Sequence, residues 1–435
     1  MSHLVAIVGR PNVGKSTLFN RLIGERKAII DDTSGVTRDR IYGLTEWNGR
    51  TVNVVDTGGF VSNTDDIFEQ AISIQVTLAI DEADVIIFMV DVTTGITDFD
   101  EAVANMLRKS KKPIVVAVNK VDNSTRHLAA NEFWGLGFEN TFFLSSITGS
   151  GSGELLDAVI DLLPPEPNND LDEDLPKVSI VGRPNVGKSS LVNALLDENR
   201  NIVTDIAGTT RDAIHSRYNK FGHDFVLIDT AGIRKKKKVH EDLEFYSVIR
   251  AVRAIDEADV CLLMIDAQNG IESQDMNIFS LIQKRKKGIV LVVNKWDLVN
   301  KETNTARDYE EQLKEKIAPF NDVHILFISA LEKKRIFKAV ELAIEVYNNR
   351  KRKIKTSVLN EALSEMLAKY PPPSHRGKLI KIKYLTQIHT SYPSFAFFCN
   401  HPKHVKESYR NYLENQIRAR FNFTGVPITI FFREK

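Results

Sequence analysis

Short apolar runs alternate with amphipathic stretches along the first 350 residues. Runs such as LVAIV (4–8) and VIIFMVDV (85–92) have the length of strands and no polar face, which is typical of parallel strands covered on both sides. DFDEAVANMLRKS (98–110) carries apolar residues at helical spacing. YGLTEW and TVNVVD flank Asn48-Gly49, which predicts a tight β-hairpin. Together these patterns predict a doubly wound α/β fold.

The whole pattern occurs twice. VGRPNVGKSTLFNRL (8–22) recurs as VGRPNVGKSSLVNAL (181–195), an offset of 173 residues that also relates DTGG (56–59) to DTAG (229–232). From DEADV onward the offset is 175 residues, and NKVD (119–122) recurs as NKWD (294–297). Four motifs in register over more than a hundred residues predict a duplicated domain.

Composition shifts mark the predicted domain boundaries. PPEPNNDLDEDLP (164–176) is rich in proline and acidic residues and is typical of an extended linker. After the second copy, segments with helical periodicity and segments in which polar and apolar residues alternate follow one another in the order α-β-β-α-β. This order predicts a small α+β domain. The predicted divisions are 1–163, 164–176, 177–350 and 351–435.

Charge is unevenly distributed. Residues 351–435 hold 16 Lys and Arg against 5 Glu, a balance of +11, whereas the first 350 residues have a balance of −10. A basic C-terminal module on an otherwise acidic chain favours a polyanionic partner for that module, and nucleic acid is the first candidate. With 43% hydrophobic residues, no signal-peptide pattern and no apolar run near 20 residues, the chain is expected to be cytoplasmic, without a membrane partner. Cys261 and Cys399 lie in apolar runs and are expected to be buried, reduced thiols.

A GRPNVGKS loop follows the first apolar run of each copy and precedes a helical stretch, which is the setting that gives the GxxxxGK[ST] motif its meaning. Its amides would cradle phosphate oxygens, its lysine would reach the outer phosphates, and its serine would ligate magnesium. One match is compatible with an ordinary glycine turn, but two in register exclude that reading. The predicted residues are Gly9, Arg10, Pro11, Asn12, Val13, Gly14, Lys15, Ser16 and Thr17, and Gly182, Arg183, Pro184, Asn185, Val186, Gly187, Lys188, Ser189 and Ser190.

Two further motifs point to the metal and the γ-phosphate. Asp56 and Asp229 end strands, which places them near the magnesium, through water. Thr37 and Thr210 lie in short polar loops and would ligate magnesium while a γ-phosphate is present, which is a switch. Thr209 competes with Thr210, although only Thr37 is available in the first copy. The DTxG blocks add Thr57, Gly58, Gly59 and Phe60, and Thr230, Ala231, Gly232 and Ile233; the Gly59 or Gly232 amide would sense the γ-phosphate.

The NKxD motifs predict which base is bound. A carboxylate accepts hydrogen bonds from N1–H and the exocyclic amine of guanine, and adenine offers no such pair. Asp122 and Asp297 would do this, while Asn119 and Asn294 tie the base edge to the loop and Lys120 and Lys295 lie along the ring. Val121 and Trp296 complete the motifs, and the short matches Ser145-Ser146 and Ser329-Ala330 would add backbone contacts to the base.

These paired blocks, followed by a basic α+β module, closely resemble the tandem-GTPase Der (EngA) family of bacterial ribosome-assembly factors. The resemblance covers nearly the whole chain. It implies two P-loop GTPase domains with a C-terminal KH-like domain, Mg²⁺-dependent hydrolysis of GTP to GDP and phosphate, and action on ribosomal RNA in maturation of the large (50S) ribosomal subunit. We expect a monomer away from the ribosome. The predicted catalytic residues are Lys15, Lys188, Thr37 and Thr210, and the predicted magnesium ligands are Ser16, Thr37 and Asp56, and Ser189, Thr210 and Asp229.

Potassium is a second cofactor that the resemblance implies. Phe60 and Ile233 stand where many small GTPases carry a catalytic glutamine, and neither side chain can orient water. Asn12 and Asn185 match the asparagine that ligates the ion in potassium-activated relatives. A cation there would offset charge developing on the phosphates. The alternative is that both asparagines only shape the loop.

Several interpretations remain open on the sequence alone. RKKKK (234–238) either contacts RNA or is a solvated charge run. The C-terminal module lacks a GxxG clamp, so its charge serves RNA contact or packing against a GTPase domain. Its many phenylalanines are interpreted as core. The chain is alternatively a nucleotide-binding scaffold with one non-hydrolysing domain; RNA modification or membrane attachment would require a domain or an anchor that the sequence does not offer.

Overall fold

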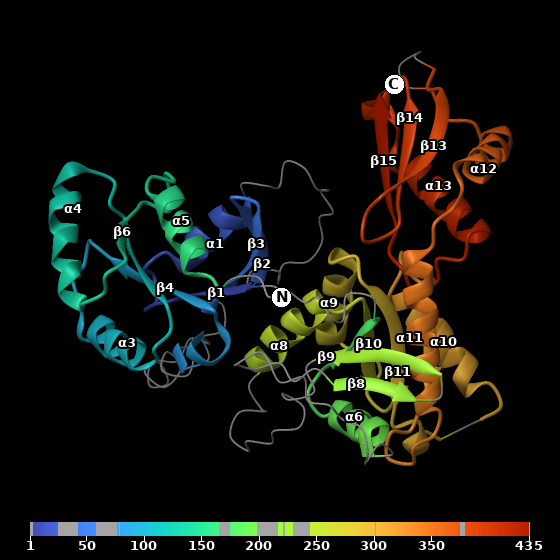
Figure 1. Cartoon of the computed structure of the whole chain (residues 1–435), viewed down its shortest axis with the longest axis horizontal. Helices are drawn as coiled ribbons and strands as arrows, with labels where there is room; N and C mark the ends of the chain where they lie inside the picture. The colour runs from blue at the N-terminus through green and yellow to red at the C-terminus, as the bar shows by residue number, and fades with distance from the viewer. Residues whose placement is uncertain are drawn as a thin grey trace. The chain divides into compact units, whose positions relative to one another are not determined.

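The computed structural model describes residues 3–24, 42–57, 76–77, 79–164, 175–197, 216–220, 222–228, 244–300, 302–374 and 379–434 (Figure 1). These residues belong to two compact units, Met1–Asn168 and Asn169–Lys435. Each unit is described by itself. The predicted boundaries at residues 163, 176 and 350 stay predictions.

The first unit contains a six-stranded sheet with the strand order β2-β3-β1-β4-β5-β6. All neighbouring strands are parallel except β2 and β3, which are antiparallel. The strands are β1 (His3–Val8), β2 (Tyr42–Trp47), β3 (Arg50–Asp56), β4 (Val85–Asp91), β5 (Ile114–Asn119) and β6 (Thr141–Phe143). The helices are α1 (Lys15–Gly24), α3 (Asp98–Lys109), α4 (Ser124–Ala129), η3 (Ala130–Leu136) and α5 (Ser152–Leu162).

Both faces of this sheet are covered, as the continuous apolar strands predict. Odd-numbered positions of β1 pack with α1 and α5, and even-numbered positions pack with α3 and η3. All seven residues of β4 are buried. The predicted hairpin joins β2 and β3, where Asn48 and Gly49 have positive φ angles of 48° and 78°. The doubly wound fold and its hairpin are therefore confirmed.

The second unit repeats this arrangement in the order β12-β11-β10-β7-β9-β8, with β8 and β9 antiparallel and the other neighbouring pairs parallel. Its strands are β7 (Lys177–Gly182), β8 (Ser216–Lys220), β9 (His223–Ile228), β10 (Val260–Asp266), β11 (Gly288–Asn294) and β12 (His324–Phe327). Its helices are α6 (Lys188–Asp197), α8 (Glu244–Glu257), α9 (Ser273–Lys284), η4 (Trp296–Leu298), α10 (Thr305–Lys316) and α11 (Ile336–Lys351).

The C-terminal module has the predicted α-β-β-α-β order: α12 (Thr356–Lys369), β13 (Ile382–Ile388), β14 (Ser394–Cys399), η5 (Pro402–His404), α13 (Glu407–Arg420) and β15 (Thr429–Glu434). Within the second unit it contacts the GTPase-like fold through Gly425. The Gly425 carbonyl accepts a hydrogen bond from Ile289 N–H at 2.7 Å, and its own N–H donates to the Asp322 carbonyl at 2.8 Å. These bonds join the C-terminal module to strand β11 and to the segment that precedes β12.

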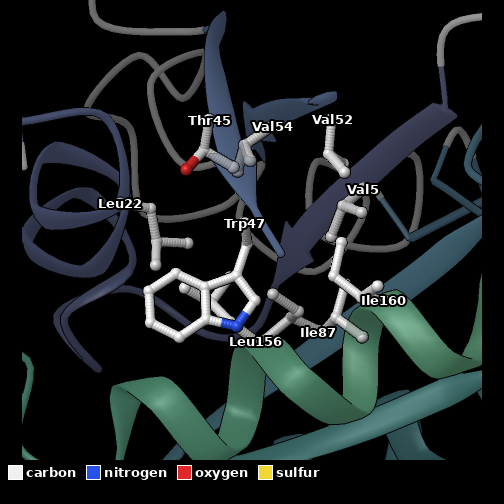
Figure 2. A pocket seen from close by; sticks show the side chains of 10 residues that line it. Val5, Leu22, Thr45, Trp47, Val52, Val54, Ile87, Leu156 and Ile160 are labelled. Atoms are coloured by element: carbon white, nitrogen blue, oxygen red, sulfur yellow. The ribbon is translucent and has the colours of Figure 1, made fainter. Parts of the chain in front are cut away.

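A small apolar cavity of about 10 Å³ lies in the core of the first unit (Figure 2). Aliphatic side chains of β1, β3, β4 and α5 line it, and the Trp47 ring closes one side. The Trp47 indole donates a hydrogen bond from Nε1 to Asp157 Oδ1 at 2.6 Å. The cavity is about the size of one water probe and lacks polar partners, so it is a dry packing void and no nucleotide site.

The burial predicted for the two cysteines is confirmed. Both Cys261 and Cys399 are free and buried, and burial raises the pKa of the Cys261 thiol to about 12. None of the described helices is long and apolar enough to cross a membrane.

Candidate functional site

The candidate site of each copy lies where the strands end and the first helix begins. Gly9 and Gly14 bracket the loop between β1 and α1, with φ angles of 150° and 103°. A Cβ atom on Gly9 would lie 2.2 Å from the Met89 carbonyl oxygen, so only glycine fits against β4. In the second copy, a Cβ atom on Gly182 would lie 2.5 Å from the Met264 carbonyl oxygen. The loop is therefore held against the central strand by backbone contact.

Lys15 and Lys188 fold back over their loops. Lys15 Nζ donates hydrogen bonds to the carbonyl oxygens of Gly9 at 2.8 Å and Arg10 at 2.7 Å, and Lys188 makes the same pair of contacts. Burial lowers the pKa of Lys15 to about 8, against an opposing effect of Asp56. A buried ammonium beside backbone carbonyls would gain from a directly bound anion, which is what a phosphate group supplies.

Ser16 and Asp56 form the described part of the candidate metal site. Ser16 Oγ donates a hydrogen bond to Asp56 Oδ2 at 2.5 Å, and the Asp56 side chain is fully buried. One hydroxyl and one carboxylate fit a Mg²⁺ ion that takes its other ligands from water and phosphate. Within the described residues, no cluster of three or more His, Cys, Asp or Glu side chains could hold a metal. This donor set therefore fits a nucleotide-bound metal ion.

Asn119 and Asn294 connect the phosphate loop to the loop after the last strand. Asn119 Nδ2 donates to the Val13 carbonyl at 2.7 Å, while its Oδ1 accepts hydrogen bonds from Ser146 N–H at 2.9 Å and Ser146 Oγ at 3.0 Å. Asn294 likewise bonds the Val186 carbonyl at 2.8 Å and Ala330 N–H at 2.9 Å. Both asparagines are 3% exposed. Each asparagine therefore joins the two loops, and its predicted contact with the base edge stays a prediction.

Lys120 and Lys295 have acidic partners that were not predicted from the sequence. Lys120 Nζ lies 2.6 Å from Asp91 Oδ2, and Lys295 Nζ lies 2.6 Å from Asp266 Oδ2. Burial raises the pKa of Asp91, but hydrogen bonds from Lys120 and Thr93 outweigh it and leave the pKa below its usual value. Asp91 and Asp266 end equivalent strands at the 175-residue offset, which is the signal that would have identified them.

Asp122 and Asp297 lie two residues after these lysines, beyond the carboxyl ends of β5 and β11. Arg126 NH1 donates to Asp122 Oδ2 at 2.6 Å, and Asn123 Nδ2 donates to Oδ1 at 3.1 Å. Both members of the Asp122–Arg126 ion pair are partly exposed, so the pairing is weak and readily displaced. The carboxylate stays accessible to a ligand.

The loop after β6 already uses the backbone N–H groups that were predicted to contact the base. Ser145 N–H donates to the Ser150 carbonyl, and Ser146 N–H is taken by Asn119, so neither is available to a base. The N–H groups of Ile147 and Leu331 come next, and neither has an acceptor among the described residues. Their side chains are 78% and 84% exposed, which is unusual for large apolar residues.

Arg10 and Arg183 were predicted as part of the phosphate loops, but their side chains contact the acidic residues that cap α3 and α9. Arg10 Nε lies 3.5 Å from Asp100 Oδ2, and Arg183 Nε lies 2.9 Å from Asp275 Oδ2. Both aspartates are buried N3 residues of capping boxes. These arginines hold the phosphate loop against the neighbouring helix.

Arg21 distinguishes the two copies. Its Nε donates to the Ser146 carbonyl at 2.6 Å, and its NH2 group donates to the Ile147 carbonyl. A Cβ atom on Gly149 would lie 2.6 Å from Arg21 NH1, so glycine leaves the space that the guanidinium occupies. Ala194 and Lys333 stand at the equivalent places in the second copy. There Ser329 N–H donates to the Lys334 carbonyl, as Ser145 N–H does to Ser150 in the first copy, and Lys334 N–H donates back to the Ser329 carbonyl.

Some predicted residues lie outside the described residues. They are Thr37, Gly58, Gly59 and Phe60, the alternative pair Thr209 and Thr210, the block Asp229, Thr230, Ala231, Gly232 and Ile233, and the basic run 234–238.

Comparisons with known proteins agree on both parts of the chain. The family model described as "50S ribosome-binding GTPase" matches residues 4–120 and 177–295, and "KH-domain-like of EngA bacterial GTPase enzymes, C-terminal" matches residues 353–433. GTPase Der of Flavobacterium johnsoniae is 58% identical over 435 residues and GTPase Der of Phocaeicola vulgatus 57% over 437, each with full coverage of both chains. A solved structure of Era with MgGDPNP and nucleotides 1506–1542 of 16S ribosomal RNA is 23% identical, covering 60% of this chain and 93% of that one, with a TM-score of 0.32.

Proposed function

The chain belongs to the family of GTPase Der and is a GTPase, and on this premise we propose that its two nucleotide sites control binding to the large ribosomal subunit during assembly. The observation that carries the proposal is the duplication of the described contacts. Each copy has a loop lysine on the same two carbonyls and an asparagine bridging the same two loops. Because both copies have these contacts, both are proposed to hydrolyse GTP.

Lys15 and Lys188 are proposed to exchange their carbonyl partners for the outer phosphates. Ser16 and Asp56 would hold Mg²⁺ with the phosphates, and the metal supplies charge neutralisation on the phosphate oxygens. Thr37 and Thr210, and Ser189 with Asp229, are proposed to complete the two metal sites. Phosphate binding by the loop amides would require no rearrangement of the loop, because glycine contacts already fix it against the central strand.

Guanine recognition is proposed to come from Asp122 and Asp297. Each carboxylate would accept from N1–H and the exocyclic amine, with Arg126 displaced in the first copy. The N–H groups of Ile147 and Leu331 are proposed as the donors to the guanine carbonyl, in place of Ser146 and Ala330, whose N–H groups are already bonded to the asparagines.

Potassium is proposed to bind near Asn12 and Asn185. Both asparagines have φ of 63°, and asparagine tolerates that left-handed conformation better than most residues. The backbone alone is therefore a sufficient reason for asparagine, and the test has to separate backbone from ligand. Asn12→Gly keeps the left-handed backbone and removes the side-chain oxygen. If the oxygen binds potassium, exchange of sodium for potassium no longer accelerates turnover in Asn12→Gly; retained acceleration means that the residue only shapes the loop.

The ribosomal part of the proposal is supported by the charge of the C-terminal module, +11 over residues 351–435, and by the family's description as ribosome-binding. Cytoplasmic location and a monomeric state away from the ribosome are part of the same proposal.

Separate Lys15→Ala and Lys188→Ala variants test whether both domains hydrolyse GTP. Each variant should keep the turnover of the untouched domain, and the double variant should lose both. If one single variant already abolishes all turnover while the untouched domain still binds nucleotide, that untouched domain is a non-hydrolysing nucleotide-binding scaffold.

A further inference from the structure

The three-stranded sheet of the C-terminal module has two different faces. Strand β14 lies between β13 and β15, and its alternate residues Phe395, Phe397 and Cys399 are fully buried against α12 and α13. Figure 1 shows both helices on one side of the sheet. The expectation that the phenylalanines form core is confirmed for Phe395, Phe397 and Phe423.

The expectation is wrong for Phe431, which is 37% exposed on the face away from the helices. The register places Tyr384, Phe398 and Arg433 side by side across the three strands of that face. Tyr384 is 38% exposed, and its ring centroid lies 5.9 Å from that of Phe398 at an angle of 49°. Tyr384, Phe398, Phe431 and Arg433 are called the aromatic face below.

The electrostatics of the aromatic face favour an anion. Arg433 is exposed, and so are Lys383, which immediately precedes Tyr384, and Lys381, three residues before it. The three strands contain a single carboxylate, Glu434, which pairs with Cys399 in the register of the opposite face. Exposed rings beside cations and without a carboxylate are the composition of surfaces that stack bases and neutralise phosphates.

We propose that the aromatic face binds single-stranded RNA, with bases stacked on Tyr384 and Phe431 and Arg433 contacting a phosphate. The proposal rests on the RNA-binding role proposed above and names the surface that performs it. It explains how a KH-like module without a GxxG loop binds RNA. The alternative ligand for such a face is a protein, and binding a protein would not require the neighbouring Lys and Arg side chains.

Stacking and phosphate contact have different signatures. Removing a stacked ring from an RNA-binding surface weakens binding by roughly 5- to 150-fold and leaves the salt dependence unchanged. Removing a phosphate contact lowers the slope of log K against log salt by about 0.7 for a single strand. Tyr384→Leu and Phe431→Leu keep an apolar side chain in the sheet, so the loss expected for each is about fivefold or more.

The experiment uses the full chain and a fluorescein-labelled single-stranded RNA of mixed sequence, followed by fluorescence anisotropy at several KCl concentrations. The variants are Tyr384→Leu, Phe431→Leu and Arg433→Gln. Tyr370→Leu is the matched control, because Tyr370 is 54% exposed in the same module but lies after α12, outside the sheet. GTP turnover and the thermal midpoint show whether each variant is folded. Photo-crosslinking of the unaltered protein to the RNA requires no variant and should label Tyr384 or Phe431.

The proposal holds if both ring variants lose affinity at constant salt slope, Arg433→Gln lowers the slope, and Tyr370→Leu binds normally. It is overturned if folded ring variants bind RNA as the unaltered protein does, or if crosslinks fall only elsewhere. Ring variants that bind RNA normally but no longer bind ribosomal subunits would indicate a protein partner for this face, and also overturn it. Absence of all RNA binding by the unaltered protein would instead refute the RNA-binding role.

Discussion

Replacing Asn119 by alanine is the perturbation that bears most directly on how the first nucleotide site is built. The Asn119 amide makes three buried hydrogen bonds, one to the Val13 carbonyl and two from Ser146. It therefore couples the loop proposed to hold phosphate to the loop proposed to hold guanine. Its Nδ2 atom would also lie 2.3 Å from a Cβ on Gly14, so the two residues are fitted to each other.

The magnitude follows from those three bonds. Each buried hydrogen bond contributes about 1 kcal/mol net, and Asn119→Ala leaves a carbonyl and an N–H unpaired. The sum is about 2–4 kcal/mol of coupling between the loops. If nucleotide binding depends on that coupling, the dissociation constant for GDP rises on the order of 30- to 1,000-fold.

The assay measures fluorescent GDP binding to the full chain in a Lys188→Ala background, so that only the first site reports. Ser146→Ala is the matched control. It removes one of the three bonds and reproduces the second copy, where Ala330 has no hydroxyl. Its effect should stay below about tenfold, because one bond contributes about 1 kcal/mol. Thermal midpoints show that each variant is folded at the assay temperature.

The reasoning is refuted if folded Asn119→Ala binds GDP within about threefold of the parent. It is also refuted if Ser146→Ala alone produces the full loss of GDP affinity, because the loss would then come from the Ser146 hydroxyl and not from the Asn119 amide.

Three further outcomes are expected. Arg21→Ala should weaken GDP binding at the first site by about 5- to 30-fold, because two charge-assisted hydrogen bonds to the loop after β6 are lost. The second site has Ala194 at the equivalent position and should bind GDP unchanged, so equal losses at both sites would contradict this reasoning. Asp91→Asn should destabilise the protein by about 1–3 kcal/mol near neutral pH, as followed by urea denaturation. Because the folded pKa of Asp91 is depressed, this difference should be constant above about pH 5 and shrink as the pH falls below about 4; a difference that grows in acid would contradict it. Both cysteines should resist a thiol reagent at pH 8 until the chain unfolds, and rapid labelling of the native protein would show that Cys261 or Cys399 is accessible.

The fold was predictable because its signals are local. The buried strands, the Asn48-Gly49 hairpin and the glycines of the phosphate loops each depend on a few consecutive residues. The duplication added long-range order, because two copies in register predict two similar sheets.

The rest of the site could not be predicted because it depends on side chains far apart in the chain. The Arg10–Asp100 pair and the Lys120–Asp91 pair cross from one strand-to-helix loop to another, and only the folded sheet brings them together. The hydrogen bond that occupies the N–H of Ser146 could not be predicted either, because its acceptor, Asn119, lies 27 residues away in the chain. Composition identified the basic C-terminal module but not which ring of Phe431 and Phe432 faces solvent, since that is set by strand register.

Sedimentation of the full chain through sucrose gradients with ribosomal subunits tests the central claim most directly. The protein is incubated with GDP or with a non-hydrolysable GTP analogue before centrifugation. Co-migration with the large subunit in the analogue but not in GDP is the predicted result, because the sites are proposed to control that contact. Failure to bind in either state, with GTP turnover intact, would contradict the ribosomal role while leaving the enzyme in place.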